Sequence, residues 1–113
     1  MIIRAALRDA NQHLRKAPVS IQKVSNILSP YLDCDEIDGM SGDTADAARS
    51  LVFALMADAY RMNRDFYEAA RWYRRASAIS PGGHATIYAH MVCKHRLSDF
   101  YVDALGVLEK QNG

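Results

Sequence analysis

The sequence predicts an all-α domain, and three observations lead to that prediction. Near the amino terminus, apolar residues recur three and four positions apart, which is the spacing of one helical face. The tripeptide Asp65-Phe66-Tyr67 recurs 34 residues later as Asp99-Phe100-Tyr101, as expected for a repeated structural unit. Proline and glycine stand where these segments should end. We therefore expect about six helices, arranged as hairpins in one domain over residues 1–113.

Composition and charge are those of a soluble globular domain. Half of the 113 residues are apolar, and the formal net charge is +1. No apolar run reaches the ~18 residues that a membrane span requires. The apolar run at Met1 is too short for a secretory signal, so we expect a cytoplasmic protein with no membrane partner. Cys34 and Cys93 are too few and too far apart for a disulfide framework, and we expect both to be free thiols.

Residues 1–32 are predicted to form an amino-terminal helical hairpin. The first helix is expected over residues 2–15, and its apolar stripe consists of Ile3, Leu7, Ala10 and Leu14. Pro18 interrupts the chain, and Ser20 can cap a second helix. The stripe of that helix consists of Ile21, Val24 and Leu28. Ser29-Pro30 either ends the second helix or opens a last turn through Tyr31-Leu32, and the sequence leaves both alternatives open.

Residues 33–45 are predicted to be an acidic loop, because they have neither helical periodicity nor much apolar content. Residues 33–46 contain no base, and their acidic residues are Asp33, Asp35, Glu36, Asp38, Asp43 and Asp46. A calcium loop follows the pattern D-x-[DN]-x-[DN]-G and has Glu at its twelfth place. Counting from Asp33, the glycine place holds Asp38 and the Glu place holds Thr44, so we expect no calcium site.

Residues 46–83 carry the strongest motif of the chain. Asp43 or Thr44 is expected to cap a helix that runs to about Met62. Asp65, with Glu68 three positions later, has the acidic form of a capping box and starts a second helix that ends at about Ser80. Small and aromatic residues recur across the pair as Phe53, Met56, Ala57, Tyr60, Ala69, Tyr73 and Pro81. Within it, residues 50–83 resemble one complete tetratricopeptide repeat, whose pattern is W-x2-L-G-x2-Y, A-x3-F and P over 34 residues.

The physical reasons for this pattern hold without the family name. Ala57 and Ala69 lie where two antiparallel helices would cross, and their small side chains let the two backbones approach closely. The aromatic anchors fill the space beside that crossing. Residues 84–113 resemble a second, degenerate repeat with one extra residue in the turn. Its anchors are Tyr88, Met91, Val92, His95, Ala104 and Leu108. Val92 and His95 depart from the family type and no proline follows, which indicates a capping hairpin.

The resemblance implies a short right-handed solenoid of helical hairpins that binds other proteins in a concave groove. Carrying the groove-lining places of the family onto this chain gives Leu51, Ala54, Asp58, Arg61, Met62, Thr86, Ala89, Cys93, Arg96 and Leu97. Some members bind the terminal carboxylate of chaperones through Lys and Asn, but here Ala54 and Asp58 stand at those places. Asp58 would repel a carboxylate, so the groove suits the apolar face of an amphipathic helix better.

No catalytic, metal or cofactor site is expected. His84, His90, Cys93 and His95 lie close in sequence, but only His90 and Cys93 share a helical face, and a closed zinc site needs four ligands. Cys93 beside a histidine is a formal thiol–imidazole pair, yet Lys94 and Arg96 indicate an exposed basic helix. The chain contains no nucleophile elbow and no glycine loop for phosphates. We expect a non-enzymatic protein-interaction module, adaptor-like or chaperone-like.

Two other hypotheses remain open. With so few hairpins, an exposed end of the stack could pair with a second copy, which predicts much exposed apolar area on the first and last helices. The segments Arg71–Arg75 and Lys94–Arg96 interleave bases with aromatics, as in proteins that bind single-stranded RNA. The net charge of +1 argues against nucleic acid. Trp72 either packs on the preceding hairpin or marks an exposed contact patch.

Overall fold

The computed structural model describes residues 2–32, 42–80 and 84–112, and in these ranges the chain is all-α, without strands. Its elements in chain order are α1 (Ile2–Leu14), α2 (Ile21–Leu28), the 3₁₀ helix η1 (Ser29–Tyr31), α3 (Gly42–Met62), α4 (Phe66–Ile79), α5 (His84–Lys94), the 3₁₀ helix η2 (Ser98–Phe100) and α6 (Tyr101–Asn112).

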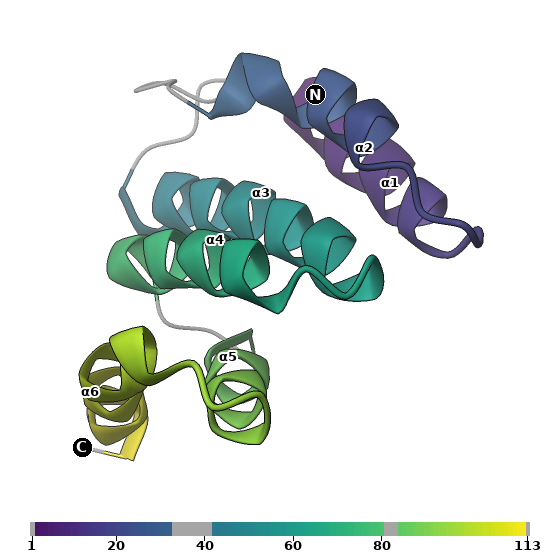
Figure 1. The fold of residues 1–113 in the computed structure, drawn as a ribbon. Coiled ribbons are helices and arrows are strands. Elements are labelled where there is room, and N and C mark those ends of the chain that lie inside the picture. Colours follow the sequence, from purple (N-terminus) through teal and green to yellow (C-terminus); the bar gives the residue numbers. More distant parts are fainter. Residues whose placement is uncertain (1, 33–41, 81–83, 113) are drawn as a thin grey trace.

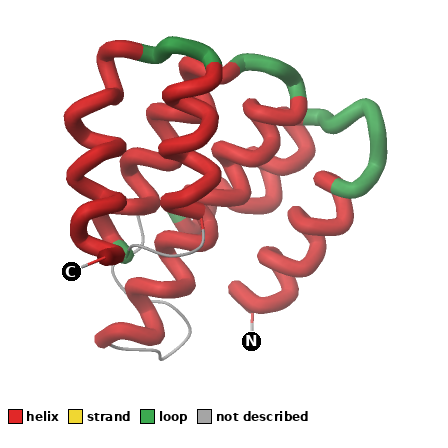
Figure 2. The backbone as a smooth tube through the Cα atoms, turned by 90° about the horizontal axis from the view of Figure 1, so that it is seen from below, coloured by secondary structure: helices red, strands yellow, loops and turns green. Residues whose placement is uncertain are grey.

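Consecutive helices pair as the hairpins α1–α2, α3–α4 and α5–α6, which succeed one another along the molecule (Figure 1). Helix α3 packs against both helices of the first hairpin, and α4 packs against α5 of the third. The view from below shows the same helices side by side (Figure 2). The molecule measures 37 × 35 × 19 Å, so it is a slab about two helix diameters (~10 Å each) thick.

The helix ends follow the local signals of the sequence. The Ser20 hydroxyl accepts a hydrogen bond from the Lys23 amide at 3.3 Å, and the Asp65 carboxylate accepts one from the Glu68 amide at 3.3 Å. Both predicted caps are therefore confirmed. Of the two alternatives at Ser29-Pro30, the structure has the last turn, because Ser29–Tyr31 forms a 3₁₀ helix directly after α2.

Helices α3 and α5 end in the same way. Arg64 and Arg96 adopt positive φ angles of 63° and 55°, the left-handed conformation that closes many helices. The next amide reaches back across the last turn in each case, from Asp65 to the Tyr60 carbonyl and from Leu97 to the Val92 carbonyl, both at 2.9 Å. These matching ends fix the register between the second and third hairpins.

Two predicted boundaries are corrected. The acidic loop does not extend to residue 45, because Gly42–Ala45 already belong to α3, and neither Asp43 nor Thr44 precedes that helix as a cap. Asp43 instead lies in the first turn, where its negative charge interacts favourably with the helix dipole. An alanine-rich segment with high helix propensity follows it. Likewise His84 is the first residue of α5 rather than a residue before it. Residues 33–41, with the calcium comparison, and 81–83 lie outside the described ranges.

The apolar core has three parts. The first lies between hairpins one and two and includes Ile3, Val24 and Met56. The second lies between hairpins two and three and includes Tyr73 and Tyr88. The third is small and is formed by Phe53, Ala54 and Ala76. The predicted crossing residues Ala57 and Ala69 are both fully buried in the second part. Because these side chains are small, the backbones of α3 and α4 can approach closely at this point.

Trp72 packs against all three parts of the core. Its ring stacks on Phe53 and Tyr60 at centroid distances of 5.8 and 6.4 Å, and the Arg75 guanidinium lies 4.8 Å from it. The side chain is half-buried, and it packs against the first part of the core, which contains residues of the first hairpin. Of the two predicted alternatives, packing is therefore the one observed.

Candidate functional site

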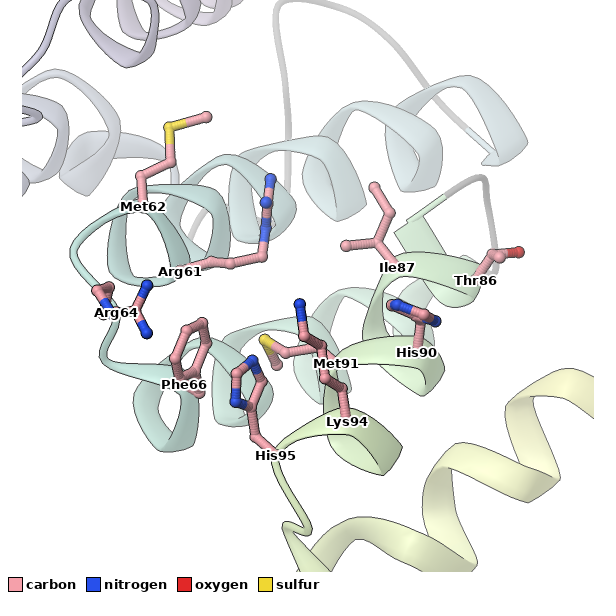
Figure 3. A pocket seen from close by; sticks show the side chains of 10 residues that line it. All are labelled: Arg61, Met62, Arg64, Phe66, Thr86, Ile87, His90, Met91, Lys94 and His95. Atoms are coloured by element: carbon pink, nitrogen blue, oxygen red, sulfur yellow. The ribbon is translucent and has the colours of Figure 1, made fainter.

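A cavity lies between the second and third hairpins of the described chain. Its volume is about 620 Å³, and ten side chains line it: Arg61, Met62, Arg64, Phe66, Thr86, Ile87, His90, Met91, Lys94 and His95. They come from the end of α3, the start of α4 and one face of α5 (Figure 3). We call this cavity the inter-hairpin pocket. Its size is that of a typical ligand or peptide pocket.

One side of the inter-hairpin pocket is apolar and aromatic. The Phe66 and His95 rings lie face to face with centroids 3.6 Å apart, and Met91 is buried beside them. Met62 and Ile87 are large apolar side chains that remain 46% and 43% exposed. Exposed apolar side chains next to a buried apolar floor are typical of surfaces that bind another protein.

The same pocket is cationic. Arg64 lies over the Phe66 ring at 5.6 Å, and Lys94 extends toward the space between α3 and α5 (Figure 3). The ten lining residues include no aspartate or glutamate. Within the described ranges, neither Arg64 nor Lys94 forms an ion pair. Two positive charges therefore face this pocket without a compensating carboxylate.

Arg61 differs from these two, because its charge is already compensated. The Arg61 guanidinium donates to the Tyr73 hydroxyl at 2.9 Å and lies 3.4 Å from the Asp58 carboxylate. The Tyr73 hydroxyl in turn donates to the Asp58 carboxylate. Burial, followed by the negative charge of Asp58, raises the pKa of Tyr73, so the phenol stays neutral and continues to donate. Asp58 therefore joins α3 to α4 instead of facing a ligand.

The third hairpin contains a similar contact, but here the tyrosine is on the first helix of the hairpin and the aspartate on the second. The buried Tyr88 of α5 donates to the Asp103 carboxylate of α6 at 2.8 Å, and burial raises the pKa of Tyr88 as well. Neither tyrosine–aspartate contact is predicted from the sequence. No local signal identifies them, because the partners belong to different helices and meet only when the hairpins close.

A buried polar contact joins the second hairpin to the start of the third. The Ser50 hydroxyl lies 2.9 Å from the carbonyls of Ala76 and Ser80 and 3.5 Å from the His84 Nε2. Burial lowers the pKa of His84, with a smaller opposing effect of Asp58. Ser50 is 2% exposed, and its hydroxyl hydrogen is directed to main-chain oxygens. This serine–histidine pair thus fixes the end of α4 against α5.

The predicted groove residues fall into several places. Arg61, Met62 and Thr86 line the inter-hairpin pocket together. Ala89 and Cys93 line a different cavity of about 310 Å³ between α5 and α6. The remaining predicted residues lie outside both cavities: Leu51 is exposed on α3, Ala54 is buried, Asp58 contacts Tyr73, Arg96 is exposed beyond α5, and Leu97 packs on the second part of the core.

The register of the hairpins explains this distribution. Arg64 and Arg96, which have positive φ angles, are 32 residues apart in the sequence. The anchor residues predicted to correspond in the two hairpins are 35 apart. With a shift of 32, the α3 positions Ala54, Asp58 and Met62 correspond to Thr86, His90 and Lys94, which all line the pocket. In the structure, the positive φ angles of the arginines that follow α3 and α5 show this spacing. The sequence alone does not reveal these φ angles.

The remaining candidate sites show no convergent ligand set. His90 and His95 line the inter-hairpin pocket, whereas Cys93 is exposed and lines the cavity on the α6 side. In the described part of the chain, no group of three or more histidine, cysteine, aspartate or glutamate side chains is placed to hold a metal ion. Over the same residues, no helix is long and apolar enough to cross a membrane.

The arginine-rich segment of α4 is occupied by contacts within the chain. Arg71 pairs with Glu68 at 2.8 Å, Arg74 lies over the Phe100 ring at 5.1 Å, and Arg75 lies over Phe53 at 4.5 Å. Tyr73 is fully buried, so it offers no face to a nucleic-acid base. The cavity beside these arginines has a volume of only about 120 Å³. Each of these three arginines thus has a partner within the chain while its side chain remains exposed.

In comparisons with known proteins, no family model matched the chain, and the searches of curated proteins and of solved structures gave no match.

Proposed function

We propose that this protein is a non-enzymatic protein-interaction module that binds an extended peptide or an amphipathic helix in the inter-hairpin pocket. One observation carries the proposal: Met62 and Ile87, which are 46% and 43% exposed, line a pocket together with the less exposed Phe66 and Met91. An inserted apolar side chain would bury these surfaces, and such burial stabilises complexes by ~25 cal/mol per Å² before the costs of association.

The architecture supports the same function. A helical hairpin has an apolar face that it cannot bury alone, so neighbouring hairpins stack and leave a surface between them for a ligand. The resemblance of residues 50–83 to a tetratricopeptide repeat agrees with this idea, and we propose a short solenoid of that type. In this proposal the end of α3, the start of α4 and one face of α5 provide the ligand surface.

Selection of peptides tests the proposal directly. The full chain is used to select from a displayed library of random peptides of about 12 residues, and the enriched peptides are then measured by fluorescence anisotropy. Ile87→Glu should weaken their binding at least about tenfold, because it places a charge at the apolar edge. Ala78→Glu, at an exposed position of α4 outside the pocket, is the control and should leave binding unchanged, with helicity and melting temperature checked for both. Equal binding by both variants would contradict the pocket assignment.

Self-association is a second candidate function, and the surface of α6 favours it. Val102 and Leu105 are 88% and 58% exposed, and Tyr101 lies beside them. Tyr101 and Leu105 line the cavity between α5 and α6, whose lining contains no charged residue. Within its described residues, α1 exposes no large apolar side chain of this kind. With only one apolar end, pairing of two α6 surfaces would give a closed dimer.

Sedimentation equilibrium separates this candidate from the first. A dimer joined through α6 should dissociate in the double variant Val102→Lys/Leu105→Lys, because two lysines would meet their copies across the two-fold axis. Ala47→Lys/Ala78→Lys adds the same charge to exposed positions of α3 and α4 and should not change the mass. A wild-type protein that stays monomeric at all concentrations would exclude this function.

A further inference from the structure

We propose that the inter-hairpin pocket selects acidic amphipathic segments, in which an apolar side chain is flanked by aspartate or glutamate. This inference rests on the proposed peptide-binding function and names the chemistry of the ligand. It departs from the expectation that a carboxylate is repelled, because that expectation depended on Asp58 facing the groove. In the structure Asp58 instead accepts hydrogen bonds from Tyr73 and Arg61.

Charge complementarity carries the inference. Arg64 and Lys94 line the pocket from opposite sides, and neither forms an ion pair within the described ranges. The nearby acids are engaged elsewhere, Asp58 with Tyr73 and Asp65 with the Glu68 amide. A ligand carboxylate would therefore meet positive charge without displacing an internal partner. Complementary charges of this kind speed association and exclude ligands of the wrong sign.

Apolar surface adjoins both cations. Phe66 and Met91 lie between Arg64 and Lys94, and Ile87 lies beyond Lys94, nearer the start of α5 (Figure 3). In the proposed complex an apolar side chain of the ligand packs on this surface, and acidic side chains beside it reach Lys94 and Arg64. Ligands with this alternation are amphipathic and negatively charged. An uncharged apolar segment would leave both cations facing a desolvated surface, which costs free energy.

The same cations would also attract a nucleic-acid phosphate, but the aromatic groups argue for a peptide. Two of the three rings in the pocket lining, Phe66 and His95, stack on each other at 3.6 Å, and the third, His90, is exposed on α5. The Arg64 guanidinium also lies over the Phe66 ring. Recognition of single-stranded RNA depends on stacking of bases on free aromatic faces. The pocket therefore favours a peptide as the ligand.

The composition of selected peptides is the first test. Peptides enriched by wild-type protein should contain an excess of aspartate and glutamate beside leucine, isoleucine or phenylalanine, and their affinity should fall as salt is raised. Lys94→Glu should weaken binding of these peptides at least about tenfold. Lys23→Glu makes the same change on the exposed face of α2 and should alter affinity by less than about twofold.

A reversed selection completes the test. Protein carrying Lys94→Glu should enrich peptides with more lysine and arginine than the wild type does. If wild-type protein enriches peptides that Ile87→Glu releases but that carry no acidic excess, the acidic preference is wrong and the peptide site stands. If Ile87→Glu releases nothing, the peptide site itself is wrong. A random single-stranded RNA that displaces the peptide and binds more tightly would assign the cations to nucleic acid and overturn the inference.

Discussion

At the residue scale, the hydrogen bond between Tyr73 and Asp58 holds the second hairpin together. Tyr73 is fully buried, and its hydroxyl also accepts a hydrogen bond from Arg61. Tyr73→Phe leaves the Asp58 carboxylate without its buried donor, so we expect a loss of about 1–2 kcal/mol in the free energy of unfolding. Urea denaturation followed by circular dichroism measures this loss.

Tyr67→Phe provides the matched control. The Tyr67 hydroxyl lies 3.4 Å from the Asp99 carboxylate at an exposed position, so its removal should cost less than about 0.5 kcal/mol. If the two phenylalanine variants are equally stable, the Tyr73 contact contributes nothing specific.

His84 gives the fold a predicted pH dependence. Burial lowers its pKa below the ordinary value of 6.5, so the unfolded chain binds a proton more readily than the folded one. The contribution of the neutral imidazole is complete above the unfolded pKa and is lost as pH falls toward the folded pKa. The free energy of unfolding should therefore decrease between about pH 7 and pH 5. His84→Gln should remove part of this decrease, whereas His90→Gln, at an exposed position, should retain it. Identical pH profiles for both variants would refute the role of His84.

Residue-scale features divide into those that the sequence predicts and those that it does not. The caps at Ser20 and Asp65 were predicted, because a cap depends only on the following three residues. The contact of Tyr73 with Asp58 was not predicted, because it depends on how two helices are rotated against each other. Without that contact, the sequence predicts that Asp58 faces the ligand groove.

At the element scale, the two copies of the Asp-Phe-Tyr tripeptide have different structures. Asp65 caps α4, whereas Asp99 lies within the 3₁₀ helix η2 and approaches the Tyr67 hydroxyl. Asp65→Ala should therefore cost about 1 kcal/mol of stability, because the Glu68 amide loses its acceptor. Asp99→Ala is the natural control and should cost less than about half of that. Chemical denaturation of the two variants tests this difference, and equal losses would show that Asp99 acts as a cap too.

The unequal turns explain why the helices were predicted better than the pocket. After the left-handed Arg64 the chain enters α4 almost at once, but after Arg96 it passes through Leu97 and the turn of η2 before α6 begins. Matching the hairpins by their anchors pairs residues 35 apart that are buried in both, such as Ala69 and Ala104, whereas the helix ends match at a spacing of 32. Turn geometry of this kind depends on tertiary packing, which residue spacing does not encode.

At the scale of the whole molecule, the all-α class was predicted because periodicity, caps and small crossing residues agree along the chain. Trp72, the only tryptophan, packs against all three parts of the core and joins the hairpins. The predicted acidic loop extended too far, to residue 45, because the acidic residues and Gly42 gave no helical periodicity, whereas α3 begins at Gly42. Of the ten groove residues predicted from the sequence, Arg61, Met62 and Thr86 line the same pocket, and the binding site itself remains a prediction.

The central claim is that a peptide binds between the second and third hairpins. Titration of the ¹⁵N-labelled full chain with a library-selected peptide, followed by amide chemical shifts, tests it most directly. We predict that the largest changes occur at Thr86, Ile87, His90 and Lys94, with α1 unaffected. Largest changes around Val102 and Leu105 on α6, or along the arginines of α4, would contradict the claim and move the binding surface to another face of the molecule.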